Sequence, residues 1–392
     1  MHIVYISIES PYDEKRGGGI ASYLRAIIPA MLAQGHQVTL ISHASQPPTN
    51  LPSNNNLRVK HIRLPNIHWV LSKTGKIADP LLLPVRQIEW SAAFYLAARR
   101  ILQKHPADVI ETAETGALFF ALHEPQKLVV RLHGCDYVFR KFTGQSLSIG
   151  TKLNFWLEKQ SIMRAWLVTS PSQFQSRQME VLLGWRTYRI QVIPNPLAEP
   201  YFNPISKFKK NRRPIILYSG RLATIKGTEI LLKAIPLLKQ KYPRILIILA
   251  GDLQMTGLKL NHDARLGLRE GFLWLGHQNQ TEMMKWYQRA SVLAIPSLYE
   301  TFGLAALEAM ACSLPVVASR VGALPEIIQD GQTGILVQSG DEKALVDGIL
   351  KILMDEKLAA KLIKNGQEKI KEYNSQQVAK NMVRSFLGIK LI

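Results

Sequence analysis

Residues 292–308 of the chain read Val292-Leu293-Ala294-Ile295-Pro296-Ser297-Leu298-Tyr299-Glu300-Thr301-Phe302-Gly303-Leu304-Ala305-Ala306-Leu307-Glu308. The first four residues form an apolar run that predicts a buried strand, and Pro296 ends it. A helix is expected to begin near Thr301. Glu300 then lies in the loop before the helix, and Glu308 lies about two turns inside it. This step from strand to loop to helix is the unit that repeats along an α/β chain.

The two carboxylates of this stretch enclose the start of a helix. The N–H groups in the first turn of a helix have no partner within it, and they therefore form a seat for phosphate. A ligand with a diphosphate in its middle and hydroxyl groups at both ends, such as a nucleotide sugar, fits this layout. An amphipathic helix with a solvated Glu at each end has the same spacing, so the neighbouring motifs must decide between the two.

Short apolar runs alternate with helical patterns in both halves of the chain. A helix over Ile20–Gln34 follows the first strand and is ended by Gly35-His36. The predicted strands are His2–Ser7, Val38–Ser42, Leu57–Ile62, Val109–Glu111, Leu128–Leu132, Leu167–Ser170, Gln191–Ile193, Ile215–Tyr218, Ile245–Ala250, Phe272–Leu275, Val292–Ile295, Val316–Ala318 and Gly334–Val337. Such strands indicate parallel sheets covered on both faces. The predicted fold is α/β, with two Rossmann-like doubly wound domains and a ligand site in the cleft between them.

The alternation lapses between Pro194 and Pro214, where prolines and basic residues indicate a linker. We predict an N-terminal domain over residues 1–198, a linker over 199–213 and a C-terminal domain over 214–372. Residues 373–392 are expected to hold a closing helix, over Ser375–Leu387. The stretch 64–86 combines apolar and basic residues broken by prolines, and we expect it to leave the sheet as a long excursion.

The chain is strongly basic, with 49 Lys and Arg against 29 Asp and Glu and a net charge of +20 over 392 residues. Nucleic acid, an anionic membrane face and anionic small molecules are the usual partners of such a chain. A nucleic-acid arm would be one concentrated block, whereas this charge is spread over both halves. The dense cluster is Lys207, Lys209, Lys210, Arg212 and Arg213, which is either a solvated linker or a binding patch.

The two cysteines, Cys135 and Cys312, lie far apart without metal-ligand spacing, which favours a reducing compartment. The first residues indicate a strand rather than a signal peptide, and no apolar run reaches the ~18–20 residues that span a bilayer. A cytoplasmic location is therefore expected. The stretch 64–86 either docks on an anionic membrane face, as on the inner face of a plasma membrane, or packs against its own domain.

Three glycines, Gly17-Gly18-Gly19, follow the first strand and open the first helix. They let a ligand approach the backbone closely, or they form a flexible turn. The dinucleotide fingerprint G-x-G-x-x-G is not met, because Ser22 stands at the position of its last glycine.

The segment Ser219–Gly227 follows the first strand of the second half and contains two cations. Arg221 and Lys226 would lie at the carboxyl edge of the sheet, where guanidinium and ammonium together bind a diphosphate. The alternative is two exposed surface cations.

The segment His133-Gly134-Cys135-Asp136 follows another strand, and Asn195 follows a third. A His at a sheet edge can contact a substrate hydroxyl, although a lone His is often structural. The chain contains no Asp-x-Asp, the motif that would hold a divalent cation on a leaving diphosphate. We therefore expect no metal or other cofactor, and fixed cations with a helix start would stabilise the leaving charge.

Taken in order along the chain, these motifs resemble those of family-four glycosyltransferases. They are Gly17-Gly18-Gly19, Gly35-His36-x-Val38, His133-Gly134-x-Asp136, Ile193-Pro194-Asn195, Gly220-Arg221-x4-Lys226-Gly227, Glu300-x7-Glu308, Gly322-Ala323-Leu324-Pro325-Glu326-Ile327-Ile328 and Asp330-Gly331-x-Thr333-Gly334. The resemblance implies a GT-B fold, a donor held mainly by the C-terminal domain, retention of configuration and no metal. The chain departs from the family at Pro196, where a Gly is usual, and at Leu253, where a second Gly is common.

The resemblance also implies a role for each matching residue. Arg221 and Lys226 would stabilise the departing diphosphate, Glu300 would hold the sugar hydroxyls, and His133 would lie by the sugar 6-position. Glu308 would hold the ribose hydroxyls. Further donor contacts are implied for Gly19, Gly220, Gly276, His277, Gln278, Thr301, Phe302, Gly303 and Leu304, and acceptor-side contacts for Gly17, Gly18, Asp136 and Asn195.

The expected activity is transfer of a hexose from a nucleoside diphosphate sugar, with UDP-glucose as the expected donor. The expected acceptor is a hydroxyl of a glycan or lipid-linked glycan in polysaccharide biosynthesis. One alternative is an inverting GT-B transferase or a sugar-nucleotide epimerase, which the configuration of the product would separate. Another is a basic nucleic-acid-binding protein with steep salt dependence, although nucleic acid is not an expected partner. The third is an inactive homologue that acts as a scaffold, against which the intact pair Glu300 and Glu308 counts.

Overall fold

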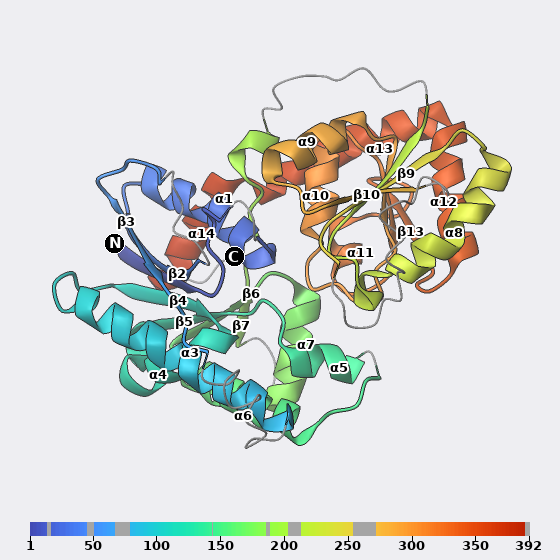
Figure 1. Ribbon diagram of the computed structural model, residues 1–392. Helices are drawn as coiled ribbons and strands as arrows, with labels where there is room; N and C mark the ends of the chain where they lie inside the picture. The colour runs from blue at the N-terminus through green and yellow to red at the C-terminus, as the bar shows by residue number, and fades with distance from the viewer. Residues whose placement is uncertain are drawn as a thin grey trace. The chain divides into compact units, whose positions relative to one another are not determined.

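The structure is a computed structural model that describes residues 1–13, 17–44, 51–66, 79–142, 144–185, 189–202, 213–253 and 272–388. The chain forms two compact units (Figure 1). Unit 1 comprises residues 1–196 and 375–392, and unit 2 comprises residues 197–374.

Unit 1 contains a seven-stranded parallel sheet in the order β3-β2-β1-β4-β5-β6-β7. Its strands are β1 (His2–Ser7), β2 (Gln37–His43), β3 (Leu57–Ile62), β4 (Val109–Ala113), β5 (Leu128–Arg131), β6 (Leu167–Ser170) and β7 (Ile190–Val192). Its α-helices are α1 (Gly19–Ala33), α3 (Asp79–Leu102), α4 (Leu118–His123), α5 (Asp136–Phe142), α6 (Ile149–Arg164), α7 (Gln173–Leu183) and α14 (Ser375–Phe386). The register pairs Tyr5 with Leu40 on one side and with Glu111 on the other.

Helices cover both faces of this sheet. α1 and α14 pack on one face, where Ile27 and Met382 belong to the same buried cluster as Tyr5 and Leu40. α3, α4 and α6 contact one another on the other face (Figure 1). α1 ends where Gly35 takes a φ of +80°, so that the N–H of His36 reaches back to the carbonyl of Met31.

Unit 2 contains a six-stranded parallel sheet in the order β10-β9-β8-β11-β12-β13. Its strands are β8 (Ile215–Ser219), β9 (Leu246–Ala250), β10 (Phe272–Gly276), β11 (Val292–Ile295), β12 (Val316–Ser319) and β13 (Ile335–Val337). Its α-helices are α8 (Thr228–Lys241), α9 (Gln280–Arg289), α10 (Leu304–Ala311), α11 (Leu324–Ile327), α12 (Glu342–Met354) and α13 (Glu356–Lys369). α8 and α12 share a buried cluster with strand residues such as Ile216 and Val317.

The doubly wound fold predicted from the sequence is confirmed in each unit, with every predicted strand present and its ends within two residues of the prediction. Both strand orders are of the Rossmann type, in which the connections reverse direction beside the first strand. The predicted closing helix is α14, which belongs to unit 1. Within the described part of the chain, no helix is both long enough and apolar enough to cross a membrane.

Two sequence predictions fall partly outside the described residues. The predicted linker over 199–213 begins with a 3-10 helix at Glu199–Tyr201, and residues 203–212 are not described, so its boundaries stay predictions. The predicted excursion over 64–86 is not described at residues 67–78. From Asp79 on, the prediction was wrong, because this part is the start of α3, which continues through Pro84.

Candidate functional site

Two loops meet at the carboxyl edge of the unit 2 sheet, one after β8 and one after β11. The connections from β8 and β11 leave in opposite directions, and doubly wound sheets bind their ligands at this reversal. Arg221 and Lys226 lie on the first loop and Glu300 on the second. The loops are tied together by a hydrogen bond from the Leu298 N–H to the Ile225 carbonyl, at 2.8 Å.

Lys226 and Glu300 form an ion pair across the two loops. Lys226 Nζ lies 2.6 Å from Glu300 Oε2, and the side chains of Lys226 and Glu300 are 26% and 12% exposed. Arg221 is exposed on the same loop, and its carbonyl accepts a 2.7 Å hydrogen bond from the Tyr218 hydroxyl. The structure thus brings Lys226 and Glu300 together, with Arg221 on the loop that carries Lys226.

Glycines allow the loops to approach this closely. Gly227 has a φ of +67°, and a side chain there would collide with the carbonyl of Pro296 on the opposite loop. Gly322 has a φ of +58°, and a side chain there would collide with the carbonyl of Glu300. The Ala323 N–H donates to that same carbonyl at 3.0 Å, so the Glu300 backbone is fixed from a third loop.

The helix after Glu300 begins at Leu304, with Gly303 as its N-cap at a φ of +105°. The prediction of a start near Thr301 was wrong, because the positive φ of Gly303 interrupts a helix. Glu308 is therefore the fifth helical residue, just over one turn inside α10 rather than two. The first N–H groups of α10 lie beside Glu300 in the sequence and remain the candidate phosphate seat.

Buried tyrosines orient the carboxylate of Glu308. The Tyr287 hydroxyl donates to Glu308 Oε2 at 2.8 Å, and lies 2.9 Å from Ser219 Oγ at the end of β8. The Tyr201 hydroxyl also hydrogen-bonds Glu308. Burial first, and then the Glu308 charge, raise the pKa of both tyrosines, which keeps their protons in place for these bonds. Tyr287 and Tyr201 could not be found from the sequence, since no local pattern links them to Glu308.

The predicted base-binding edge, Gly276-His277-Gln278, comprises the last residue of β10 and the two that follow it, at the same carboxyl edge of the sheet. The Gln278 amide donates to the carbonyl of Leu275 at 3.1 Å and to that of His277 at 2.9 Å. His277 Nδ1 lies 3.6 Å from Asp252 Oδ2 on the loop after β9. Leu253, where the family commonly has Gly, pairs with Leu222 in an isolated parallel bridge. The backbone at Leu253 therefore extends the strand pairing to the start of the loop that holds Arg221.

In unit 1, the N-terminus of α1 is capped by a carboxylate. Glu9 Oε2 accepts from the N–H of Gly18 at 3.0 Å and from that of Ala21 at 2.8 Å. A side chain on Gly18 would collide with this carboxylate, whereas a side chain on Gly19 would meet open space. Of the three glycines, Gly19 is thus the one that leaves room for a ligand beside the backbone.

His133 follows β5, at the carboxyl edge of the unit 1 sheet. Its N–H donates to Glu114 Oε2 at 3.1 Å, and its ring lies 5.5 Å from the ring of Tyr23. Burial, and next the charge of Arg131, lower the pKa of His133 to about 3, so its imidazole is neutral at pH 7. Asp136 pairs with Arg140 at 2.7 Å on α5.

Asn195 belongs to a buried network around Arg131. Arg131 has no solvent exposure, and its Nη2 donates to Asn195 Oδ1 at 2.8 Å and to the Ile193 carbonyl at 2.9 Å. Its guanidinium lies 4.4 Å from the centre of the Tyr23 ring. Tyr23 in turn donates to Glu111 at 2.7 Å. The Asn195 side chain therefore has a partner inside the unit 1 fold.

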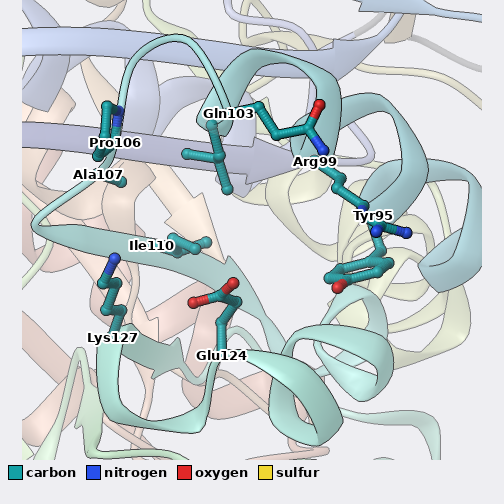
Figure 2. Close-up of a pocket in the computed structure, with 9 residues that line it drawn as sticks. Tyr95, Arg99, Gln103, Pro106, Ala107, Ile110, Glu124 and Lys127 are labelled. Atoms are coloured by element: carbon teal, nitrogen blue, oxygen red, sulfur yellow. The ribbon is translucent and has the colours of Figure 1, made fainter.

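A pocket of about 210 Å³ lies at the opposite, amino-terminal edge of the unit 1 sheet (Figure 2). Pro106 and Ala107, just before β4, and Glu124 and Lys127, just before β5, line it, with Tyr95 from α3. None of the predicted site residues lines this pocket. Among the described residues, no three His, Cys, Asp or Glu side chains converge where they could hold a metal ion.

Two family models match the chain. The Glycosyltransferase Family 4 model matches residues 17–198, and the Glycosyl transferases group 1 model matches residues 202–369. Together these ranges cover every strand of the two sheets except β1, and nearly all of the residues discussed above.

Individual relatives and solved structures agree with these models over the whole chain. The phosphatidyl-myo-inositol mannosyltransferase of Mycobacterium leprae is 25% identical over 396 residues, which cover 97% of this chain and 96% of that protein. Sucrose-phosphate synthase of Thermosynechococcus elongatus has a TM-score of 0.78 at 22% identity, covering 99% and 98% of the two chains. Anabaena HepE, solved in complex with UDP-glucose, has a TM-score of 0.71 at 20% identity, covering 99% and 100%. At these identities, the structural likeness shows the fold alone.

Proposed function

Because the chain belongs to the family-four glycosyltransferases, we propose that it transfers a hexose from a UDP-linked donor to a hydroxyl of a glycan or lipid-linked acceptor, with retention of configuration. Polysaccharide biosynthesis is the proposed setting. The observation that carries the proposal is the Lys226–Glu300 pair of 2.6 Å at the strand-order reversal of unit 2.

The cations of the site supply the stabilisation that this reaction needs. As the bond between sugar and diphosphate breaks, negative charge grows on the diphosphate. Arg221 and Lys226 stand on one loop, and the positive end of the α10 macrodipole follows closely after Glu300, the ion-pair partner of Lys226, in the sequence. Charge-assisted hydrogen bonds from such groups stabilise the departing diphosphate, and the groups need not reorganise during the reaction because the fold already holds them in place. We propose that no divalent metal takes part, in keeping with a sequence that has no Asp-x-Asp.

The two glutamates are proposed as hydroxyl clamps at the two ends of the donor. Glu300 would accept from the sugar hydroxyls while Lys226 neutralises part of its charge. Tyr287 already orients the Glu308 carboxylate with one hydrogen bond. A carboxylate can accept several hydrogen bonds, so Glu308 would also accept from the ribose hydroxyls. The departing phosphate would accept the proton of the acceptor hydroxyl, so no separate base is assigned. The neutral imidazole of His133 is proposed to hydrogen-bond the sugar 6-hydroxyl.

UDP-glucose is the proposed donor, a choice that the HepE complex supports by analogy. A lipid-linked acceptor is supported by the mannosyltransferase relative, whose name places phosphatidyl-myo-inositol among its substrates. Peripheral association with an anionic membrane is proposed from the net charge of +20.

A nucleotide-sugar panel tests the proposal. The protein is incubated with UDP-, GDP- and ADP-hexoses, and proton NMR follows the release of the nucleotide and the anomer of the transferred or hydrolysed sugar. Turnover confined to a UDP-hexose, with the donor's own configuration in the first product, supports the proposal. The opposite configuration would indicate an inverting enzyme. No turnover and no nucleotide binding would overturn the assignment.

A further inference from the structure

One helix of unit 1 presents apolar side chains on both of its faces. α6 buries Phe155, Leu157 and Ile162 against its own unit, where it contacts α3, α4 and α5. On its other side, four apolar residues are exposed: Ile149 by 75%, Leu153 by 40%, Trp156 by 53% and Met163 by 49%.

These four residues lie on one face of the helix, which also carries the partly exposed Gln160. Their spacing along the chain places them within about 80° of one another around the helix, at 100° per residue. Trp166, 46% exposed, follows the end of the helix. Single exposed apolar residues are ordinary on a protein surface, whereas a contiguous patch marks a contact site. We name Ile149, Leu153, Trp156, Met163 and Trp166 the α6 stripe.

Cations flank the stripe on both sides. Lys152 and Lys159 fall along one side of it and Arg164 along the other, and Lys152 and Arg164 are exposed. The single acidic residue of α6 is Glu158, which is 2% exposed and lies on the opposite, buried face. The outward face of α6 therefore carries the four apolar residues and Gln160 along its middle, and its charged residues, at the margins, are all cationic.

This pattern is that of a helix lying in the plane of a membrane surface. Trp, Leu, Ile and Met insert among the headgroups and upper acyl chains, Trp favours the interface, and Lys and Arg contact lipid phosphates. The net charge of +20 attracts the protein to an anionic surface before contact. A second copy of the chain fits less well. A two-fold pairing would set Lys152 and Arg164 against the same cations of the partner helix.

We propose that the α6 stripe and its cations are the surface by which this protein docks on an anionic phospholipid bilayer. The inference rests on the membrane association in the proposed function, and assigns it to a different element from residues 64–86. It does not depend on the sugar-transfer chemistry of unit 2.

Vesicle flotation tests the assignment. Vesicles of phosphatidylcholine alone and of phosphatidylcholine with phosphatidylglycerol are mixed with the full chain at low and high salt. The test variants are Ile149→Ser with Trp156→Ser, and Lys152→Glu with Arg164→Glu. Control variants change exposed residues elsewhere in the same number: Val181→Ser on α7 with Met354→Ser on α12, and Lys357→Glu with Lys361→Glu on α13. Circular dichroism melting checks that each variant folds.

The wild type and controls are expected to float only with anionic vesicles, and less at high salt. Binding should fall at least about fivefold for each cation lost, the factor that corresponds to ~1 kcal/mol per Lys or Arg at such a surface. If the wild type binds and the folded α6 variants bind equally well, the assignment to α6 is overturned while membrane association stands. If the wild type binds no vesicle, the assignment to α6 and the proposed membrane association both fail. The turnover of UDP-hexoses still tests the transferase proposal separately.

A label on the stripe separates insertion from surface attraction. The two native cysteines are buried, so Leu153→Cys can be labelled selectively with a nitroxide, with Val181→Cys as its control. Anionic vesicles should shield the label at residue 153 from a water-soluble relaxation agent and leave that at residue 181 accessible. Equal accessibility at both would contradict insertion. Loss of a dimer in the α6 variants, seen by sedimentation, would assign the stripe to a second copy instead.

Discussion

Lys226 and Glu300 are joined by a 2.6 Å ion pair that links the loop after β8 to the loop after β11. The two residues are 74 positions apart in the chain, and they meet because the parallel sheet places both strand ends at one edge. The proposed chemistry of unit 2 depends on this meeting point.

Lys226→Ala should lower the turnover of the donor by roughly 10²- to 10³-fold, the cost of removing one preorganised charge-stabilising donor. Lys226→Arg should retain part of the activity. The melting temperature should change little, because both side chains keep some solvent contact and such pairs contribute little to stability. Kinetics followed by nucleotide release measure the effect. Lys285→Ala, which removes a surface ion pair on α9, is the control. Wild-type turnover in Lys226→Ala would remove this residue from the mechanism.

Tyr287→Phe should raise the KM for the donor and leave kcat nearly unchanged, because Glu308 is assigned to the ribose, away from the breaking bond. The lost hydrogen bond to a half-buried carboxylate should also cost about 1.5–3 kcal/mol of unfolding free energy. Steady-state kinetics and urea titration measure the two effects. Tyr95→Phe in unit 1 is the control. A fall in kcat with KM unchanged would show that Glu308 acts at the reacting centre instead.

Gly227→Ala should unfold more easily than Gly331→Ala. Both glycines have nearly the same positive φ, +67° and +68°, so both substitutions strain the backbone to a similar degree. A side chain at residue 331 meets open space, whereas one at residue 227 collides with the Pro296 carbonyl. Thermal melting compares the two variants, and nucleotide release should be lost only in Gly227→Ala. Equal melting temperatures would mean that the loops are not held together as described.

Glu158→Gln should change how stability depends on pH. Burial, and next the charge of Glu114, raise the pKa of Glu158 to about 8, from an ordinary value of 4.5. The folded protein therefore holds a proton that the unfolded chain releases. That stabilisation is complete below about pH 4.5 and is lost as the pH rises to about 8. At roughly 1.4 kcal/mol per pKa unit, the loss is on the order of a few kcal/mol.

Gln mimics the protonated acid, so the variant should lack this decline and be the more stable protein at pH 8. Urea titrations at pH 5 and pH 8 measure it, with the exposed Glu356→Gln as control. Parallel pH profiles for the wild type and Glu158→Gln would show that the carboxyl is ionised in the folded protein.

The sequence predicted the architecture well because its strands are buried on both faces. Apolar runs such as Val292–Ile295 predict strands without any knowledge of their neighbours. Because parallel strands all end at one edge of the sheet, the residues that follow each run are expected at that edge. Arg221, Lys226 and Glu300 were found in this way. The start of α10 was misplaced because it depends on the φ of one residue, Gly303.

The partners of the site residues could not be predicted, since they come from distant parts of the chain. Tyr287 reaches Glu308 from a neighbouring helix, and Arg131 reaches Asn195 across 64 residues. Glu9 caps α1 from a loop whose conformation no periodicity specifies. The α6 stripe was also hidden, because apolar residues on both faces give the helix no clear amphipathic pattern in sequence.

Calorimetric titration of UDP into the wild type, Lys226→Ala and Lys285→Ala tests the central claim most directly. The account predicts saturable one-site binding to the wild type and to Lys285→Ala. It predicts binding at least about tenfold weaker to Lys226→Ala, since a lost hydrogen bond to a charged group costs about 1.5–3 kcal/mol. Equal affinity for all three proteins, or no binding to the wild type, would contradict a nucleotide-sugar site at this edge of unit 2.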